Sequence, residues 1–132
     1  MYRSNLASTY FRRGLARGDL SEYAGAAADA RRAVALAEGL PSGRGQDWFE
    51  TACAHAALAG LAGRDGSGVS AAEAVTEAQA AVALLRRAVA MGYRSPAGFR
   101  TEDALGPLRG RDDFRLLMMD VAFPAEAFAR GK

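Results

Sequence analysis

The stretch from Ser70 to Met91 constrains the fold of this chain more than any other, because it reads as one long amphipathic helix. Apolar residues recur there at steps of three and four, which places them on one side of a helix. A second apolar line runs beside the first, so we expect this helix to have neighbours on more than one side. The first line is Val75, Ala78, Val82, Leu85 and Val89, and the second is Ala74, Ala81, Leu84, Ala88 and Met91.

The ends of this helix are marked by residues that typically begin and end helices. Ser70 and Glu73 have the spacing of a capping box, in which each side chain bonds a backbone N–H that the helix leaves unpaired. Gly92 follows the last turn, where glycine commonly terminates a helix. These signals predict a helix that begins after Ser70 and stops before Gly92.

The composition of the 132-residue chain favours packed helices and excludes several classes of protein. Half of the residues are hydrophobic, many of them alanine, and only 8% are aromatic. The formal net charge is +2 and the arginines are spread along the chain, whereas a nucleic-acid-binding protein carries a dense basic stripe. The single cysteine favours a reducing compartment, and no apolar run reaches the roughly 18 residues of a membrane-spanning helix. We therefore expect a soluble cytoplasmic protein without a nucleic-acid or membrane partner.

Glycine- and proline-rich breaks divide the rest of the chain into further helices. We expect Gly14 and Gly18 to end the first helix, and Asp19 with Glu22 to form the capping box of the second. Asp47 is expected to cap the third helix. The predicted helices cover about 1–15, 19–38, 47–61, 70–91, 96–101 and 111–122, with one turn at 104–108.

An internal repeat relates the two halves of the chain. The motif RRAVA at 31–35 reappears at 86–90, near the end of a helix that follows another helix and a loop. Leu6-Ala7 with Tyr10, and Trp48 with Thr51-Ala52 and His55, loosely follow the W-x2-L-G-x2-Y frame of the tetratricopeptide repeat. The fold is therefore predicted to be all-α, with two degenerate tetratricopeptide-like antiparallel helix pairs in a short α-solenoid and a C-terminal helical cap. We expect a single domain over 1–132, with the first pair in 1–39, the second pair in 46–92, and the cap and tail in 93–132.

A further set of short motifs connects this chain to a known family. The most specific are LRRAV at 85–89, GYR at 92–94 and AFP at 122–124. In these motifs, and from about 34 to 128, the chain resembles the C-terminal region of planctomycete-type bacterial serine/threonine kinases that bear tetratricopeptide repeats. The glycine-rich loop, H-R-D and D-F-G motifs of a kinase domain are absent from the sequence. The resemblance therefore implies the terminating cap of a repeat array and carries over no catalysis.

Cys53 and His55 are the residues that most invite a catalytic or metal-binding interpretation. Residues two apart on a helix point to opposite sides, and the chain has no second cysteine or histidine. The same geometry argues against a nucleophilic Cys–His pair. We therefore expect no metal and no cofactor, with His55 packed between helices and Cys53 acting as a small apolar filler.

Several charged or apolar groups have both a functional and a structural interpretation. The arginine pairs at 12–13, 31–32 and 86–87 suit phosphate or RNA, but their positions near helix C-termini favour a structural role. The acidic pairs at 102–103 and 112–113 lack the spacing of a calcium loop. The apolar cluster of the last helix suits either a partner face or the core, and the core is favoured because a cap must cover the last repeat. That cluster comprises Phe114, Leu117, Met118 and Phe123.

The leading functional interpretation is a non-enzymatic protein–protein interaction or scaffold module. The alternative is a purely structural terminating cap of a longer repeat protein with no ligand of its own, which an apolar exposed face on the first helix would favour. The partner is accordingly a protein or peptide, upstream repeats or the kinase region of a larger protein, or a second copy bound through the first helix pair. Peptides in such repeats lie along the first helix of each pair, so the expected binding face comprises Asn5, Ser8, Arg12, Phe49, Glu50 and Cys53.

Overall fold

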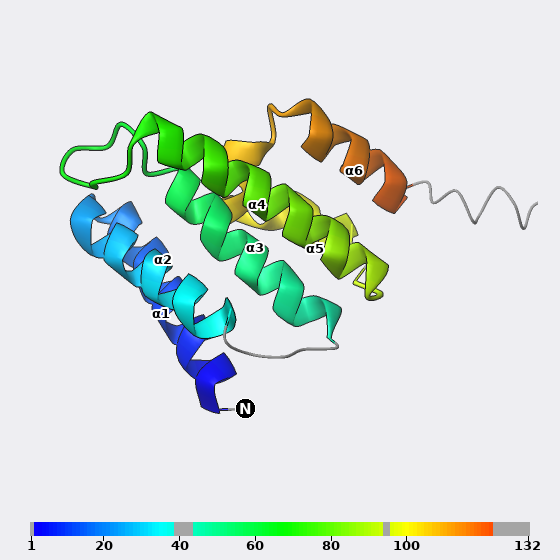
Figure 1. Ribbon diagram of the computed structural model, residues 1–132, viewed down its shortest axis with the longest axis horizontal. Coiled ribbons are helices and arrows are strands. Elements are labelled where there is room, and N and C mark those ends of the chain that lie inside the picture. The colour runs from blue at the N-terminus through cyan, green and yellow to red at the C-terminus, as the bar shows by residue number, and fades with distance from the viewer. Residues whose placement is uncertain (1, 39–43, 94–95, 123–132) are drawn as a thin grey trace, which may run out of the picture.

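The structure, a computed structural model, describes residues 2–38, 44–93 and 96–122, and the regular elements in these ranges are helices (Figure 1). Helix α1 packs on α2 and α3 packs on α4, and the two pairs meet through α2 and α3. The 3₁₀ helix η1 lies against α3, while α4 and α5 contact α6. The prediction of an all-α fold with two helix pairs and a C-terminal cap is confirmed. The elements are α1 (Tyr2–Asp19), α2 (Tyr23–Glu38), α3 (Gly45–Ala59), α4 (Ala71–Ala90), α5 (Pro96–Thr101), η1 (Asp103–Leu108) and α6 (Asp112–Ala122).

Helix α4 begins and ends where the sequence predicts. The Ser70 hydroxyl oxygen accepts a hydrogen bond from the Glu73 N–H at 3.0 Å, while the Glu73 carboxylate pairs with an arginine of α2. Gly92 has φ of 101°, and the N–H of Tyr93 reaches back to the carbonyl of Ala88 at 2.9 Å. This is the Schellman arrangement, in which a glycine in the left-handed region ends the helix. None of the helices in the described ranges combines the length and apolarity that a bilayer crossing requires.

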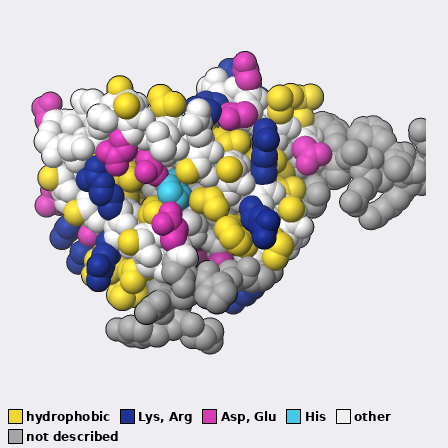
Figure 2. Space-filling model, in the orientation of Figure 1, with side chains coloured by type: hydrophobic (Ala, Val, Ile, Leu, Met, Phe, Trp, Pro, Cys, Tyr) yellow, Lys and Arg dark blue, Asp and Glu magenta, His cyan; other side chains and the backbone are white. Residues whose placement is uncertain are grey.

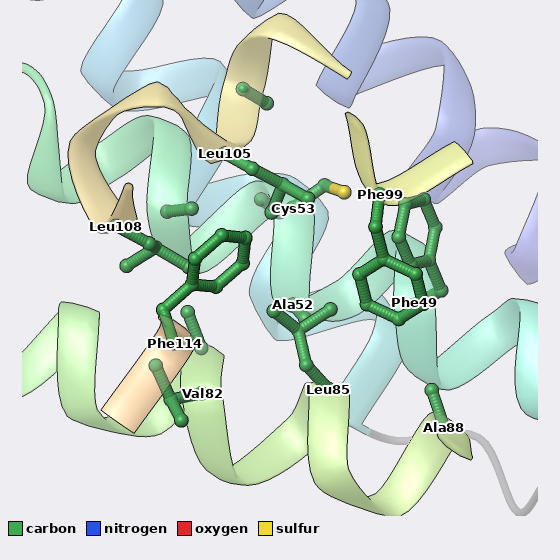
Figure 3. Close-up of a cluster of buried hydrophobic side chains, with 14 of the residues drawn as sticks. Phe49, Ala52, Cys53, Val82, Leu85, Ala88, Phe99, Leu105, Leu108 and Phe114 are labelled. Atoms are coloured by element: carbon green, nitrogen blue, oxygen red, sulfur yellow. The ribbon is translucent and has the colours of Figure 1, made fainter. Parts of the chain in front are cut away.

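The apolar line of α4 is buried with one exception. Ala78, Val82, Leu85 and Val89 are buried, but Val75 is 53% exposed, so its predicted burial is wrong. The C-terminal cap packs against later turns of α4, where Figure 3 shows Phe114 beside Val82. Because Val75 lies two turns before Val82, it falls outside this contact.

The predicted boundary between the first two helices is also wrong. Helix α1 continues through Gly14 and Gly18 to Asp19, so Asp19 does not cap α2, which begins at Tyr23. Gly14 is buried against α2, and a Cβ atom placed there would lie 3.1 Å from the Cβ of Asp29. This glycine therefore permits close packing of two helices rather than ending one of them.

Close packing also explains where α3 begins. The helix starts at Gly45, so Asp47 lies in its first turn and does not occupy the predicted capping position. A Cβ atom at Gly45 would lie 2.9 Å from both the Ala88 carbonyl oxygen and the Tyr93 nitrogen. The start of α3 is thus packed directly on the end of α4.

The largest core cluster joins α3 and α4 to the C-terminal cap (Figure 3). The ring of Phe49 stacks on Tyr93 at 4.5 Å and meets Phe99 edge-on at 5.2 Å between centroids. Phe114 and Leu117 of α6 are buried, which confirms the core interpretation for these two residues, whereas Phe123 lies outside the described ranges. The cap is therefore an integral part of the core.

Candidate partner-binding pocket

A pocket of about 200 Å³ lies where α1, α2 and α3 meet. Its most buried lining residues are apolar, and alanines contribute from all three helices. Alanine has the smallest side chain that still favours a helix, so the three helices pack closely yet leave unfilled volume between them. The apolar lining comprises Ala7 and Phe11 of α1, Ala33 and Ala37 of α2, Trp48 and Ala54 of α3, and Leu84 of α4.

The polar side of the pocket is dominated by carboxylates. Ser8 of α1 donates a hydrogen bond to Oε1 of Glu50 of α3 at 3.0 Å, which connects the two helix pairs. Glu38, at the end of α2, is 61% exposed and lies at the solvent-facing edge of the pocket. Asp47 and Thr51 complete this side, and the described lining holds no lysine or arginine. The pocket therefore carries negative charge in a chain whose net charge is positive.

His55 lies beside the pocket in a cluster of its own. It is 6% exposed, with Nδ1 bonded to Glu77 of α4 and Nε2 3.5 Å from Glu38 of α2. Figure 2 shows the single histidine between acidic side chains. The predicted packing of His55 between helices is confirmed. Because its two nitrogens face different carboxylates, they do not converge on one ion, and no group of three metal-binding side chains occurs among the described residues.

The expected binding face is only partly available to a partner. Ser8 and Glu50 line the pocket, and Arg12 is exposed on α1 with its guanidinium 3.5 Å from Glu102. Phe49 and Cys53 are buried, which corrects their assignment to that face. In an open repeat array their side of α3 would face a groove, but here Tyr93 and Phe99 pack on Phe49, and η1 packs on α3. Asn5 belongs to α1, and its side chain lies outside the described part of the structure.

Burial affects the thiol of Cys53 and the indole N–H of Trp48. Loss of solvent raises the pKa of the Cys53 thiol well above its ordinary value, so the thiol stays protonated at neutral pH. Trp48 lines the pocket, and its buried indole N–H has no acceptor among the described residues. The guanidinium of Arg87 lies over the Trp48 ring, 5.2 Å from its centroid.

Each arginine pair has at least one member that contacts a side chain of another element, which is consistent with the favoured structural role. Arg13 forms two hydrogen bonds with Asp29 of α2, at 2.9 and 2.8 Å. Arg31 bonds Glu73 of α4 at 2.9 Å. The side chains of these two arginines, and that of Arg87, each contact a side chain of a neighbouring helix.

Sequence reasoning missed the pocket residues Glu38, Asp47 and Trp48. Glu38 and Asp47 flank the break between the second and third helices, and Trp48 was assigned only as the first position of the repeat frame. The local periodicity of the sequence does not predict that these three residues line one pocket. Comparison of the chain with models of protein families, with curated proteins and with solved structures found no match.

Proposed function

We propose that this chain is a non-enzymatic protein-interaction module whose pocket between α1, α2 and α3 receives an apolar side chain of a protein or peptide partner. The observation that carries the proposal is the pocket itself, about 200 Å³ in volume with an apolar buried lining. An apolar cavity of about 150 Å³ is large enough to bind benzene. The space therefore suits one leucine or phenylalanine side chain, whose burial contributes about 1.5–3 kcal/mol.

The residues of the pocket support binding better than catalysis. Its described lining contains no histidine, cysteine or lysine, and the Ser8 hydroxyl, which donates to Glu50, serves to connect α1 to α3. His55 has both ring nitrogens directed at carboxylates, and Cys53 is buried elsewhere in the core. An interaction role needs only a shaped surface, which the pocket provides.

A terminating cap without a ligand is the weaker alternative. Upstream repeats would stack on an exposed apolar face of the first helix pair. From Leu6 to Asp19, α1 exposes no large hydrophobic side chain. The large hydrophobic residues that are exposed in the described ranges are Leu20, Val75, Met91, Leu116 and Met119; Leu116 and Met119 share α6, and none of the five belongs to α1.

A peptide-display selection against the immobilised chain tests the proposal. Ala37→Leu places a larger side chain in the pocket lining, whereas Ala35→Leu makes the same change at an exposed position of the same helix. We expect selected peptides to bind the native chain and Ala35→Leu but not Ala37→Leu, with thermal melts confirming that both variants fold. Equal binding to all three proteins, or no enrichment of any peptide, would contradict the pocket's role.

A further inference from the structure

The charged side chains in the described lining of the pocket are all acidic. Glu38, Asp47 and Glu50 contribute three carboxylates, and no cationic side chain belongs to the described lining. Charges that are partly shielded from water interact more strongly than charges in bulk solvent. A partner that brings an acidic group to this pocket is therefore opposed, and one that brings a cation is attracted.

Two nearby arginines, Arg12 and Arg87, contact side chains other than the pocket carboxylates. Arg12 is 3.5 Å from Glu102 of the segment before η1, and Arg87 lies over the ring of Trp48. Neither arginine belongs to the residues that line the pocket. The contacts described for these two arginines are therefore with Glu102 and Trp48, and not with a pocket carboxylate.

The carboxylates of Glu38 and Glu50 retain capacity for further hydrogen bonds. Ser8 uses one oxygen of Glu50, but an ionised carboxylate accepts several donors. Glu38 is largely exposed, and its contact with His55 spans 3.5 Å. A guanidinium or ammonium group at the pocket entrance would find acceptors on both α2 and α3.

We propose that the partner is a peptide segment in which a bulky apolar residue lies next to arginine or lysine. The apolar side chain enters the cavity between α1, α2 and α3, and the cationic group pairs with Glu38 and Glu50. This inference rests on the proposed function and adds the chemistry of the partner. Electrostatic complementarity of this kind selects partners and speeds association, and it weakens as salt rises.

Trp48 supplies a direct reading of binding, because it is the only tryptophan of the chain and lines the pocket. The probes are three short peptides with a central leucine and no aromatic residue, flanked by arginine, by glutamine or by glutamate. A fourth peptide keeps the arginines and replaces the leucine by glycine. Each peptide is titrated into the full chain at low and at high salt while the Trp48 fluorescence is recorded.

The inference predicts that the arginine–leucine peptide binds at least about tenfold more tightly than each of the other three peptides, and more weakly at high salt. In the chain, Glu38→Gln with Glu50→Gln should reduce its affinity by about tenfold or more. The matched pair Asp65→Asn with Asp120→Asn, two exposed acids outside this pocket, should not change the affinity.

Two kinds of failure are distinguishable. Equal affinity for the glutamine and arginine peptides, abolished by Ala37→Leu, would overturn the cationic inference while leaving the pocket's role intact. Binding of the arginine peptide that Ala37→Leu does not reduce would contradict the proposed function. Absence of binding by the arginine peptide would also overturn the inference. The display selection would then test independently whether the pocket binds any peptide.

Discussion

Ser8 of α1 and Glu50 of α3 share a hydrogen bond of 3.0 Å that connects the two helix pairs beside the pocket. The residues are 42 positions apart in the chain and both are partly buried. The bond therefore fixes one wall of the pocket relative to another. Any partner that enters the pocket meets a surface whose shape depends on this contact.

Ser8→Ala is expected to lower the free energy of unfolding by about 1 kcal/mol, because it removes a donor to a charged acceptor. Glu50→Gln should cost less, since the amide oxygen still accepts from Ser8. Urea denaturation of Ser8→Ala, Glu50→Ala and their double variant measures the coupling between the two side chains, because each of these substitutions removes the hydrogen bond. Purely additive effects would mean that this hydrogen bond does not stabilise the fold.

Asp29 provides a pH-dependent contribution to stability. It is 3% exposed and accepts two hydrogen bonds from Arg13, which hold the pKa of its carboxyl group below its ordinary value. A lowered folded-state pKa gives stability that is present above the unfolded-state pKa and is lost as the pH falls through the folded-state value.

Asp29→Asn should therefore lower the melting temperature at neutral pH. The difference from the native chain should shrink below about pH 4, where the unfolded-state carboxyl group begins to protonate. Thermal melts between neutral and acidic pH measure this difference, with Asp65→Asn in an exposed loop as the control. A difference that stays constant through the acidic range would contradict the ion-pair explanation.

Gly45→Ala is expected to destabilise the fold by about 1–3 kcal/mol, because the added methyl group overpacks the junction of α3 and α4. Its Cβ would lie 2.9 Å from two backbone atoms, which move less readily than side chains. Gly106→Ala, where a Cβ meets nothing within 4 Å, is the matched control. Chemical denaturation compares the two, and an equal effect of both substitutions would refute the packing argument.

The Cys53 thiol should react slowly in the folded protein. Burial raises its pKa and excludes reagents, and the thiolate is the reactive form. We expect alkylation at neutral pH to be limited by opening of the structure and to become fast in urea. A native rate equal to the rate in urea would show that the side chain is accessible.

The sequence predicted best those features that depend on neighbouring residues in the chain. The start of α4 at Ser70 and its end at Gly92 follow from local hydrogen bonding, and both were predicted. Gly14 and Val75 were misread because their roles depend on another element. Gly14 meets α2 across a tight contact, and Val75 lies before the turns that the cap covers.

The pocket was harder to predict because three helices create it. Ser8 and Glu50 were assigned to a shared face through the repeat frame, and they do meet. Phe49 and Cys53 were assigned to the same face, but both are buried, because Tyr93, α5 and η1 pack on that side of α3. The tetratricopeptide repeat frame describes an open array of helix pairs. It does not predict which helix faces the C-terminal cap covers.

The most direct test of the account is the indole N–H resonance of Trp48 in a two-dimensional NMR spectrum, because the chain has one tryptophan and it lines the pocket. A peptide selected on the native chain is added stepwise, and the resonance is followed. The account predicts a saturable shift of this signal together with amides of α1, α2 and α3, absent in Ala37→Leu and present in Ala35→Leu. Shifts confined to α6, around the exposed Leu116 and Met119, with Trp48 unchanged, would contradict it.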